Sequence, residues 1–222
     1  MNSIKDQFSE GLKAVSFDFD GVICDSEKYW NTLMVDFVSK HINYTMQDQM
    51  QVKGMSQHDS WEKLYNEFGL QLDYQEYFDG MQKLIEDMYY TTSKPVDGLI
   101  EVLEYLKSQG ITIGVATSSR KVWVRTFLEK FNLLEYFDDI TTSEDVEKSK
   151  PDPAIYKLSI ERLGVKNTQA IVIEDSRNGI VAGNGAGVFT IGLLTDMNEA
   201  ADIEDSSITL SGYGEVLDFL KS

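Results

Sequence analysis

The sequence predicts an α/β fold, in which a Rossmann-like doubly wound parallel sheet carries an inserted all-helical domain. Two observations predict it. Short apolar runs alternate with helical patterns along most of the chain, and one long segment contains helical patterns alone. Strands that alternate with helices of ordinary length pair in parallel, with helices on both faces of the sheet. In such sheets a ligand binds outside the carboxyl ends of the strands.

Three apolar runs predict strands, and each is followed by a polar turn. They lie at residues 13–19, 111–116 and 169–173. Three helical patterns lie between them, at residues 99–109, 121–131 and 154–163. Glycines follow the first and third of these patterns, where helix C-terminal caps are expected, at Gly110 and Gly164.

The segment from residue 26 to residue 90 contains no convincing strand. Its aromatic and apolar residues recur at helical spacing, as in Tyr29, Leu33 and Phe37 and again in Trp61 and Leu64. We therefore assign residues 26–90 to the inserted helical domain, and residues 1–25 with 91–222 to the Rossmann-like core. The aromatic side chains are expected to form the core of a small bundle rather than a ligand cage.

The charge of the chain excludes two classes of partner. Among 222 residues, 20 Lys and Arg face 37 Asp and Glu, a formal net charge of −17, which repels nucleic acid and anionic membrane surfaces. The N-terminal residues show no apolar signal segment. A single cysteine, Cys24, excludes an intrachain disulfide and fits a reducing compartment. We expect a cytoplasmic monomer that binds neither nucleic acid nor membranes.

Two aspartates, Asp18 and Asp20, stand at the carboxyl end of the first predicted strand, directly before Gly21. Successive strand side chains point to opposite faces, so the two carboxylates converge only if the chain turns there, and glycine permits such a turn. A solvated turn or a helix N-cap is the alternative for an isolated pair of this kind. The position at a strand end favours a functional role.

A second acidic pair, Glu174 and Asp175, ends the last predicted strand. Strand ends of one parallel sheet face the same edge, so four carboxylates would crowd one cleft and raise each other's pKa values. A hard divalent cation relieves this conflict, and Mg²⁺ suits oxygen ligands best. The alternative is that Asp175 or Ser176 only caps the helix that follows.

Two further segments fall at corresponding edges of the predicted sheet. Thr117 and Ser118 follow the second strand, and Lys150 opens the turn KPDP before a helix. A hydroxyl and backbone N–H groups at such a turn can hold a phosphoryl oxygen, and a lysine supplies a compact positive charge. The alternatives are that Thr117 is a helix cap and Lys150 a surface lysine.

Taken in order, the segments DFDGV, TSS, KPDP and IEDS resemble the haloacid dehalogenase superfamily of phosphohydrolases and phosphomutases. The resemblance extends from about Lys13 to the end of the chain. The helical insertion resembles the cap domain of the subgroup that includes beta-phosphoglucomutase and sugar-phosphate phosphatases. A cap of this kind is expected to close over the substrate and exclude bulk water.

The resemblance implies a two-step phosphoryl transfer. Asp18 would attack phosphorus and form an aspartyl-phosphate, while Asp20 would protonate the leaving oxygen and then activate water. Thr117, Ser118 and Lys150 would hold the phosphoryl oxygens. The implied cofactor is Mg²⁺, and its implied ligands are the Asp18 carboxylate, the Asp20 carbonyl and Asp175, with Glu174 close by.

The chain departs from the resemblance in the helical insertion. In beta-phosphoglucomutase the cap supplies a His and an Arg, the latter gripping the distal phosphate, and here Trp30 and Gln57 stand at the corresponding positions. A bisphosphate intermediate would be held poorly without that second cation. Gly54 and Gln57 belong to a loop that we expect to face the substrate. A polar turn between helices is the alternative.

The sequence therefore predicts a Mg²⁺-dependent phosphatase of small phosphorylated metabolites, with sugar phosphates as the favoured class. A halide leaving group needs no proton, so an acid at Asp20 disfavours dehalogenation. Two alternatives stay open, a hexose-phosphate mutase of the beta-phosphoglucomutase type and a non-catalytic regulatory protein of the same fold.

Overall fold

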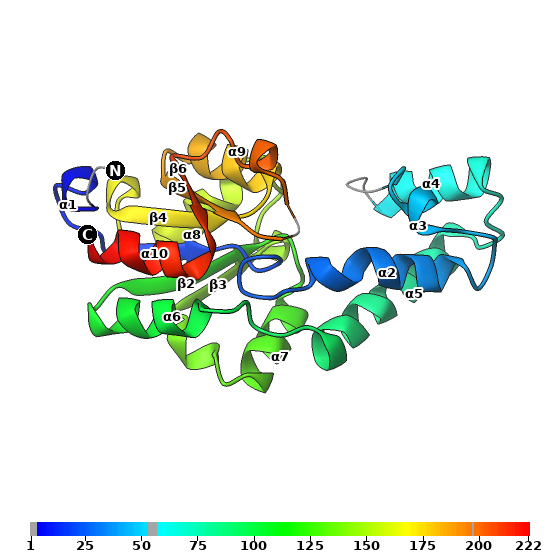
Figure 1. Ribbon diagram of the computed structural model, residues 1–222, viewed down its shortest axis with the longest axis horizontal. Coiled ribbons are helices and arrows are strands. Elements are labelled where there is room, and N and C mark those ends of the chain that lie inside the picture. Colours follow the sequence, from blue (N-terminus) through cyan, green and yellow to red (C-terminus); the bar gives the residue numbers. More distant parts are fainter. Residues whose placement is uncertain (1–3, 53–56, 197) are drawn as a thin grey trace. The chain divides into compact units, whose positions relative to one another are not determined.

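The computed structural model describes residues 4–52, 57–196 and 198–222 (Figure 1). The chain forms two compact units. We call Met1–Asp25 with Pro95–Ser222 the α/β unit, and Ser26–Lys94 the helical unit. The assignment of the helical segment to a cap domain stays a prediction.

The α/β unit is built on a six-stranded, wholly parallel sheet with the strand order β3-β2-β1-β4-β5-β6. The two central strands, β1 and β4, are the starting points from which the connections run outward in opposite directions, which defines a doubly wound sheet. The predicted fold class is confirmed. The strands are β1 (Ala14–Phe17), β2 (Thr112–Thr117), β3 (Asp139–Thr142), β4 (Ala170–Glu174), β5 (Phe189–Leu194) and β6 (Ile208–Ser211).

The three predicted strands correspond to β1, β2 and β4, which occupy the middle of the sheet. Strands β3, β5 and β6 are not among the predicted elements. β3 and β6 have only four residues each, DITT and ITLS, and most of them are polar. Such short runs at the edges of a sheet lack the apolar continuity by which a buried central strand is recognised.

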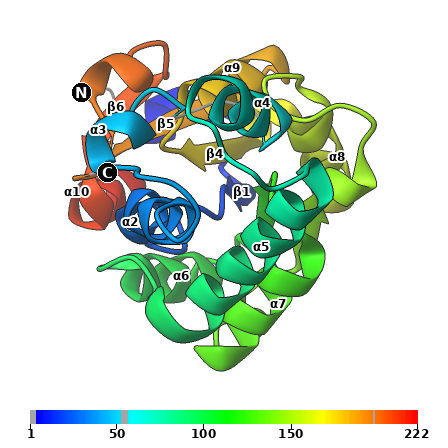
Figure 2. The same cartoon turned by 90° about the vertical axis from the view of Figure 1, so that its right-hand side faces the viewer.

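Helices cover both faces of the sheet. α8 and α9 pack together on one face, α6 and α10 pack together on the other, and α7 lies against the edge strand β3. Figure 2 shows α9 and α6 on opposite sides of β4 and β1. The helices of this unit are α1 (Ile4–Gln7), α6 (Leu99–Ser108), α7 (Lys121–Lys130), α8 (Ala154–Arg162), α9 (Arg177–Gly185) and α10 (Gly212–Lys221), with short 3₁₀ turns η2 (Leu134–Tyr136), η3 (Ser143–Asp145), η4 (Asn167–Gln169) and η5 (Ala200–Asp202).

The helix ends fall where the glycines predict them. Gly110 and Gly164 follow α6 and α8 and have φ angles of +69° and +71°, the left-handed conformation that terminates helices at low steric cost. The three predicted helices therefore agree with α6, α7 and α8 to within one residue at each end.

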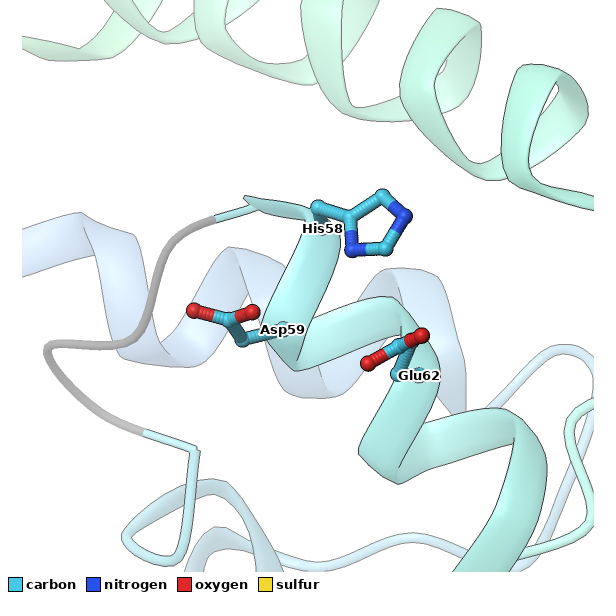
Figure 3. Close-up of side chains that lie close together, drawn as sticks. All are labelled: His58, Asp59 and Glu62. Carbon is cyan, nitrogen blue, oxygen red and sulfur yellow. The ribbon is translucent and has the colours of Figure 1, made fainter.

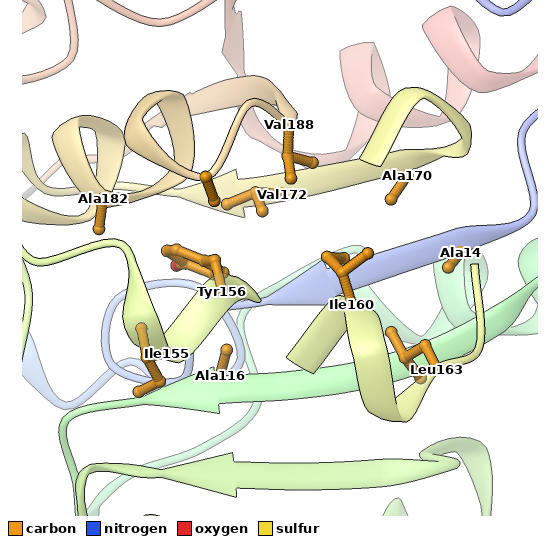
Figure 4. Close-up of a cluster of buried hydrophobic side chains, with 11 residues drawn as sticks. Ala14, Ala116, Ile155, Tyr156, Ile160, Leu163, Ala170, Val172, Ala182 and Val188 are labelled. Atoms are coloured by element: carbon orange, nitrogen blue, oxygen red, sulfur yellow. The ribbon is translucent and has the colours of Figure 1, made fainter. Parts of the chain in front are cut away.

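Small side chains on one face of the sheet let α8 and α9 approach closely (Figure 4). Ala14, Ala116 and Ala170 point to this face and are completely buried. The hydroxyls of Ser16 on β1 and Ser159 on α8 lie 2.8 Å apart in a buried hydrogen bond. This close packing brings the first turn of each helix near the carboxyl ends of the central strands.

The helical unit contains only helices among its described residues, and aromatic side chains fill its core. Phe37, Trp61 and Phe68 pack around buried Leu64 and Tyr77, as expected for a small bundle, whereas Tyr65 is 49% exposed. Its elements are α2 (Glu27–Val38), α3 (Met46–Gln49), α4 (Gln57–Glu67), α5 (Tyr74–Asp87) and a π-helical turn η1 (Met88–Thr92). Within the described ranges of the chain, no helix has the length and apolar character needed to span a membrane.

A partly buried ion pair anchors the turn after β3. Arg162 donates to Asp145 Oδ1 at 3.0 Å, and the backbone N–H of Thr142 donates to Oδ2 at 2.9 Å. Burial raises the pKa of Asp145, but these hydrogen bonds outweigh it and lower the pKa from 3.8 to about 2. The ion pair therefore stabilises the fold fully when the pH is above the pKa of Asp145 in the unfolded chain. This stabilisation is lost as the pH falls through the lower pKa of Asp145 in the folded chain.

Asp145→Asn is expected to lower the free energy of unfolding at neutral pH by about 1 kcal/mol, since the pair is partly exposed. The difference between variant and wild type should shrink as the pH falls from 4 toward 2, because the carboxylate becomes protonated first in the unfolded state and then, near pH 2, in the folded state. Urea unfolding of both proteins between pH 7 and pH 2 measures it. A difference that stays constant over this range contradicts the assignment.

Candidate active site

Asp18 follows β1 directly and is buried beside a lysine. Its side chain is 11% exposed, and Lys150 Nζ donates to its Oδ1 at 2.6 Å. The Lys150 side chain is itself only 6% exposed, so it is not the surface lysine that a lone lysine in a turn would suggest. Residues 132 positions apart in the chain thus meet at the carboxyl end of the central strand.

Glu174 ends β4 and is fully buried next to the same lysine. Lys150 Nζ donates to Glu174 Oε1 at 2.7 Å, and the Tyr156 hydroxyl donates to the same oxygen at 2.8 Å. The other oxygen, Oε2, accepts from the backbone N–H of Asp175 at 3.0 Å and of Ser176 at 3.1 Å. The Ser176 hydroxyl also donates to Oε2 at 3.0 Å, so five donors hold this carboxylate in place.

The pKa of Asp18 is shifted in the direction expected from the sequence. Burial, followed by the neighbouring Glu174 carboxylate, raises the pKa of Asp18 from 3.8 to about 8, although Lys150 opposes the shift. Burial on its own lowers the pKa of Lys150, but Asp18 and Glu174 raise it above its ordinary value. The ammonium group therefore stays charged, and the cluster carries more negative than positive charge.

Asp175 lies against the turn that follows Asp18. A Cβ atom placed on Gly21 would come 1.8 Å from Asp175 Oδ2, and Gly21 has a φ of +75°. Glycine is required there for both reasons. The carbonyl of Asp175 accepts a hydrogen bond of 2.6 Å from Asn198 Nδ2, which ties the loop after β5 to the end of β4. The N-cap of α9 is Ser176, whose Oγ accepts from Gly179 N–H at 3.2 Å.

The loop after β2 brings a row of hydroxyls to the same edge of the sheet. Thr117 is buried, and its Oγ1 accepts from the backbone N–H of Ser119 at 3.0 Å. The N-cap of α7 is Arg120, so Thr117 does not cap that helix. Ser119 Oγ donates to Asp20 Oδ2 at 2.6 Å, which joins this loop to the first motif. Ser118 lies between them with its side chain exposed.

The structure thus brings together seven predicted site residues in the α/β unit: Asp18, Asp20, Thr117, Ser118, Lys150, Glu174 and Asp175. Two others belong to the helical unit. Gln57 begins α4, and its Oε1 accepts from Gln82 Nε2 at 3.5 Å, while Gly54 lies outside the described residues. Trp30 packs against the core of the helical unit.

Three residues of the site were not predicted, Tyr156, Ser119 and Asn198. Tyr156 lies on α8 six residues after Lys150, where a helical pattern marks it as a core residue. Ser119 stands within the TSS segment, and its spacing from Thr117 offered a weak signal. Asn198 lies in a loop without any regular pattern, so only the folded structure shows its bond to Asp175.

Among the residues that the structure describes, two groups of side chains have ligand atoms close enough to hold a metal ion. Oxygens of Asp18, Glu174 and Asp175 lie within 4.8 Å of one another, and all three residues are buried. His58, Asp59 and Glu62 satisfy the same distance on α4, but all three are exposed on one helix (Figure 3). Figure 3 shows the three side chains extending from the N-terminal part of α4. The buried group is the better candidate.

Gly179→Ala tests how tightly Glu174 is enclosed. Alanine favours helices over glycine by about 1 kcal/mol. However, a Cβ atom at Gly179 would lie 1.7 Å from Glu174 Oε1, so the carboxylate must move. We expect a net loss of about 1–3 kcal/mol in the free energy of unfolding, as in an overpacked core.

The matched control is Gly214→Ala in α10, where a Cβ atom meets nothing within 4 Å. This variant is expected to be neutral or more stable. Urea unfolding of both variants measures the difference, and equal stability changes would show that Glu174 has room to move.

Comparisons with known proteins agree with this fold. The family model for haloacid dehalogenase-like hydrolases matches residues 15–193. A phosphorylated carbohydrates phosphatase of Thermotoga maritima is 29% identical over 213 residues, which cover 95% of this chain and 99% of that protein. A beta-phosphoglucomutase of Bacillus subtilis is 31% identical over 191 residues, covering 82% of this chain and 83% of that protein.

A solved structure from Thermotoga maritima, provisionally described as a beta-phosphoglucomutase, has a TM-score of 0.83 and 27% identity. The alignment covers 95% of this chain and 99% of that one. The family match identifies the protein as a hydrolase built on this parallel α/β sheet. The chain belongs to the haloacid dehalogenase-like hydrolase family. The predicted family is confirmed.

Proposed function

We propose that this protein is a Mg²⁺-dependent phosphatase of small phosphorylated metabolites, with sugar phosphates as the favoured class. One observation carries the proposal, the buried contact of Asp18 with Lys150 at the central strand ends of a chain that belongs to a hydrolase family. Relatives named for phosphatase activity, among them one that acts on phosphorylated carbohydrates, support a phosphohydrolase. A buried carboxylate beside a fixed cation is the arrangement that a nucleophile for phosphoryl transfer needs.

In this proposal Asp18 and Asp20 divide the chemistry. An oxygen of Asp18 bonds to phosphorus while the bond from phosphorus to the leaving oxygen breaks, and Asp20 gives that oxygen a proton. The Asp20 carboxylate then takes a proton from water, whose oxygen bonds to phosphorus as the bond to Asp18 breaks. The hydrogen bond from Ser119 supports this assignment because it fixes the Asp20 carboxylate beside the Thr117 loop.

Lys150 and Thr117 would hold the phosphoryl group during both steps. Lys150 Nζ already lies 2.6 Å from Asp18, so its charge is next to the proposed nucleophile, where the phosphoryl oxygens would be held. Thr117 and Ser118 offer hydroxyl and backbone donors at the end of β2, the neighbour of β1 in the sheet. In this proposal the helical unit acts as the cap domain that selects the substrate.

The residues of the buried cluster fit a divalent cation. Two buried carboxylates, Asp18 and Glu174, contact one ammonium group, and a ligand oxygen of the buried Asp175 lies within 4.8 Å of theirs. Burial, and then the charge of Glu174, raises the pKa of Asp18. Asp18, the Asp20 carbonyl and Asp175 would hold Mg²⁺, with Glu174 close by. When bound, the ion supplies positive charge that neutralises carboxylate and phosphoryl oxygens.

A screen of sugar phosphates and other small phosphoesters tests the proposal. We expect phosphate release with Mg²⁺, loss of release after EDTA treatment, and recovery when Mg²⁺ is returned. Preference among sugar phosphates that differ far from the phosphoryl group would support a selecting cap. If no phosphate is released from any phosphoester, the phosphatase assignment is wrong.

A hexose-phosphate mutase is the second candidate, because one relative is named as a beta-phosphoglucomutase. Trp30 and Gln57, which stand where the resemblance implies a His and a phosphate-gripping Arg, weigh against it. Isomerisation of a hexose phosphate that requires a sugar bisphosphate primer, without net phosphate release, would favour the mutase. If neither activity appears and EDTA changes neither stability nor ligand binding, a non-catalytic regulatory protein is favoured.

We also propose a cytoplasmic location and a monomeric state. The buried single thiol of Cys24 is compatible with a reducing compartment. Light scattering of the purified protein measures the oligomeric state.

A further inference from the structure

Lys150 has more hydrogen-bond acceptors within reach than it has protons. Its Nζ lies 2.6 Å from Asp18 Oδ1, 2.7 Å from Glu174 Oε1, and 2.9 Å from both the Ala116 carbonyl and the Tyr156 hydroxyl. A lysine ammonium carries three N–H groups, so four oxygens compete for them. The side chain is buried, and water therefore does not supply a substitute. The relative strengths of the four acceptors therefore decide how strongly the ammonium group of Lys150 hydrogen-bonds to Asp18.

Tyr156 differs from the other three acceptors because it also donates. Its hydroxyl donates to Glu174 Oε1 at 2.8 Å, while the Lys150 ammonium lies 4.7 Å from the centre of its ring. The residue is completely buried on α8, within the apolar cluster between α8, α9 and the sheet (Figure 4). Burial, and then the charges of Glu174 and Asp18, raises the pKa of Tyr156 well above its ordinary value, so the hydroxyl keeps its proton.

Glu174 has little capacity for a further partner. A carboxylate has about four lone-pair sites, and five donors already contact this one. Lys150 and Tyr156 must share Oε1. The hydrogen bond from Tyr156 therefore partly neutralises the negative charge of Oε1, which weakens the attraction of Oε1 for the ammonium group.

We propose that Tyr156 is a positioning residue for Lys150. By donating to Glu174, its hydroxyl weakens the attraction of Glu174 for the ammonium and leaves Lys150 directed at Asp18. Any effect of Tyr156 on catalysis rests on the proposed phosphatase function, in which Lys150 holds the phosphoryl group. Without the hydroxyl, Glu174 Oε1 pairs with Lys150 alone and draws the ammonium away from Asp18.

Tyr156→Phe removes only the hydroxyl, which donates to Glu174 and accepts from Lys150, and it keeps the ring, the packing of the apolar cluster and the contact of the ring with Lys150. Glu174 Oε1 still accepts from Lys150 in this variant, so no buried polar atom of Glu174 is left without a partner and folding is retained. Tyr105→Phe is the matched control. Tyr105 also lies under a lysine, with Lys221 Nζ 5.6 Å from its ring centre, and its hydroxyl donates to the Leu220 carbonyl at 3.1 Å.

The first readout is independent of catalysis. In the full chain labelled with ¹⁵N-lysine, the ammonium signal of Lys150 is identified by its absence in Lys150→Arg. We expect Tyr156→Phe to move this signal, and Tyr105→Phe to leave it in place. An unmoved Lys150 signal in Tyr156→Phe would overturn the proposal.

The second readout is steady-state kinetics with Mg²⁺ and the best phosphoester found for the wild type. For Tyr156→Phe we expect kcat to fall about tenfold and KM to stay within about twofold, because the charge that Lys150 meets grows in the transition state. Tyr105→Phe should keep both constants. Equal losses in the two variants, or a moved signal with unchanged kcat, would overturn the positioning role. If the wild type hydrolyses nothing, the proposed function fails, while the signal still shows whether Tyr156 orients Lys150.

Discussion

Asp18→Asn abolishes phosphate release, with an expected loss of about 10⁴-fold or more in kcat, as for other removed nucleophiles. The amide is nearly isosteric with the carboxylate but does not attack phosphorus. Folding should be retained, because Asp18 is buried in a cluster with surplus negative charge that already raises its pKa to about 8. Phosphate release and urea unfolding of the same preparation measure both effects.

The matched control for Asp18→Asn is Asp145→Asn. Asp145 follows the edge strand β3 and accepts from Arg162, so it belongs to the same unit and to an ion pair of its own. Its amide variant is expected to lose a little stability and to keep kcat. Phosphate release by Asp18→Asn at a rate within tenfold of the wild type would refute a nucleophilic role for Asp18.

Lys150→Met removes the ammonium group that contacts two buried carboxylates, and it is expected to cost both stability and activity. Breaking a buried ion pair by removing one partner costs about 3–5 kcal/mol, because the other charge stays buried without compensation. Asp18 and Glu174 both lose their contact at 2.6 and 2.7 Å. Loss of a donor to the developing charge should lower kcat by about 10³-fold.

Lys107→Met provides the comparison for stability. Lys107 pairs with Asp138 at 2.9 Å, but the side chains of this pair are 33% and 41% exposed. Its removal should cost no more than about 1 kcal/mol and leave kcat unchanged. Urea unfolding and phosphate release of both variants measure the contrast, and similar stability losses would contradict the burial argument.

The centre of the fold and most of the candidate site follow from the sequence for one physical reason. Buried parallel strands are continuous apolar runs, and their carboxyl ends share one edge, so polar residues that follow such runs are expected to converge. Asp18, Glu174 and Asp175 were placed together by this rule. The edge strands β3 and β6 lack such apolar runs, so this rule does not predict them.

The contacts that orient the site side chains could not be predicted in the same way. Tyr156 looks like any aromatic residue on the apolar face of a helix, and nothing in the pattern marks its hydroxyl as a partner of Glu174. The enclosure of Glu174 depends on the turn at Ser176 and on the space above Gly179, which are features of three-dimensional structure. The sequence also assigned Glu174 to the surroundings of Mg²⁺, whereas its five donors favour an additional role in holding Lys150.

The pairing of β1 with β4 has a consequence for the order in which the chain folds. Ala14 pairs with Ala170 and Phe17 with Ile173, so the first strand to leave the ribosome must wait for most of the chain before its central neighbour exists. Contacts of such long sequence separation are slow to form. Asp18 and Lys150 can meet Glu174 only after β4 has been synthesised, and a nascent or truncated chain that ends before β4 therefore lacks the complete site.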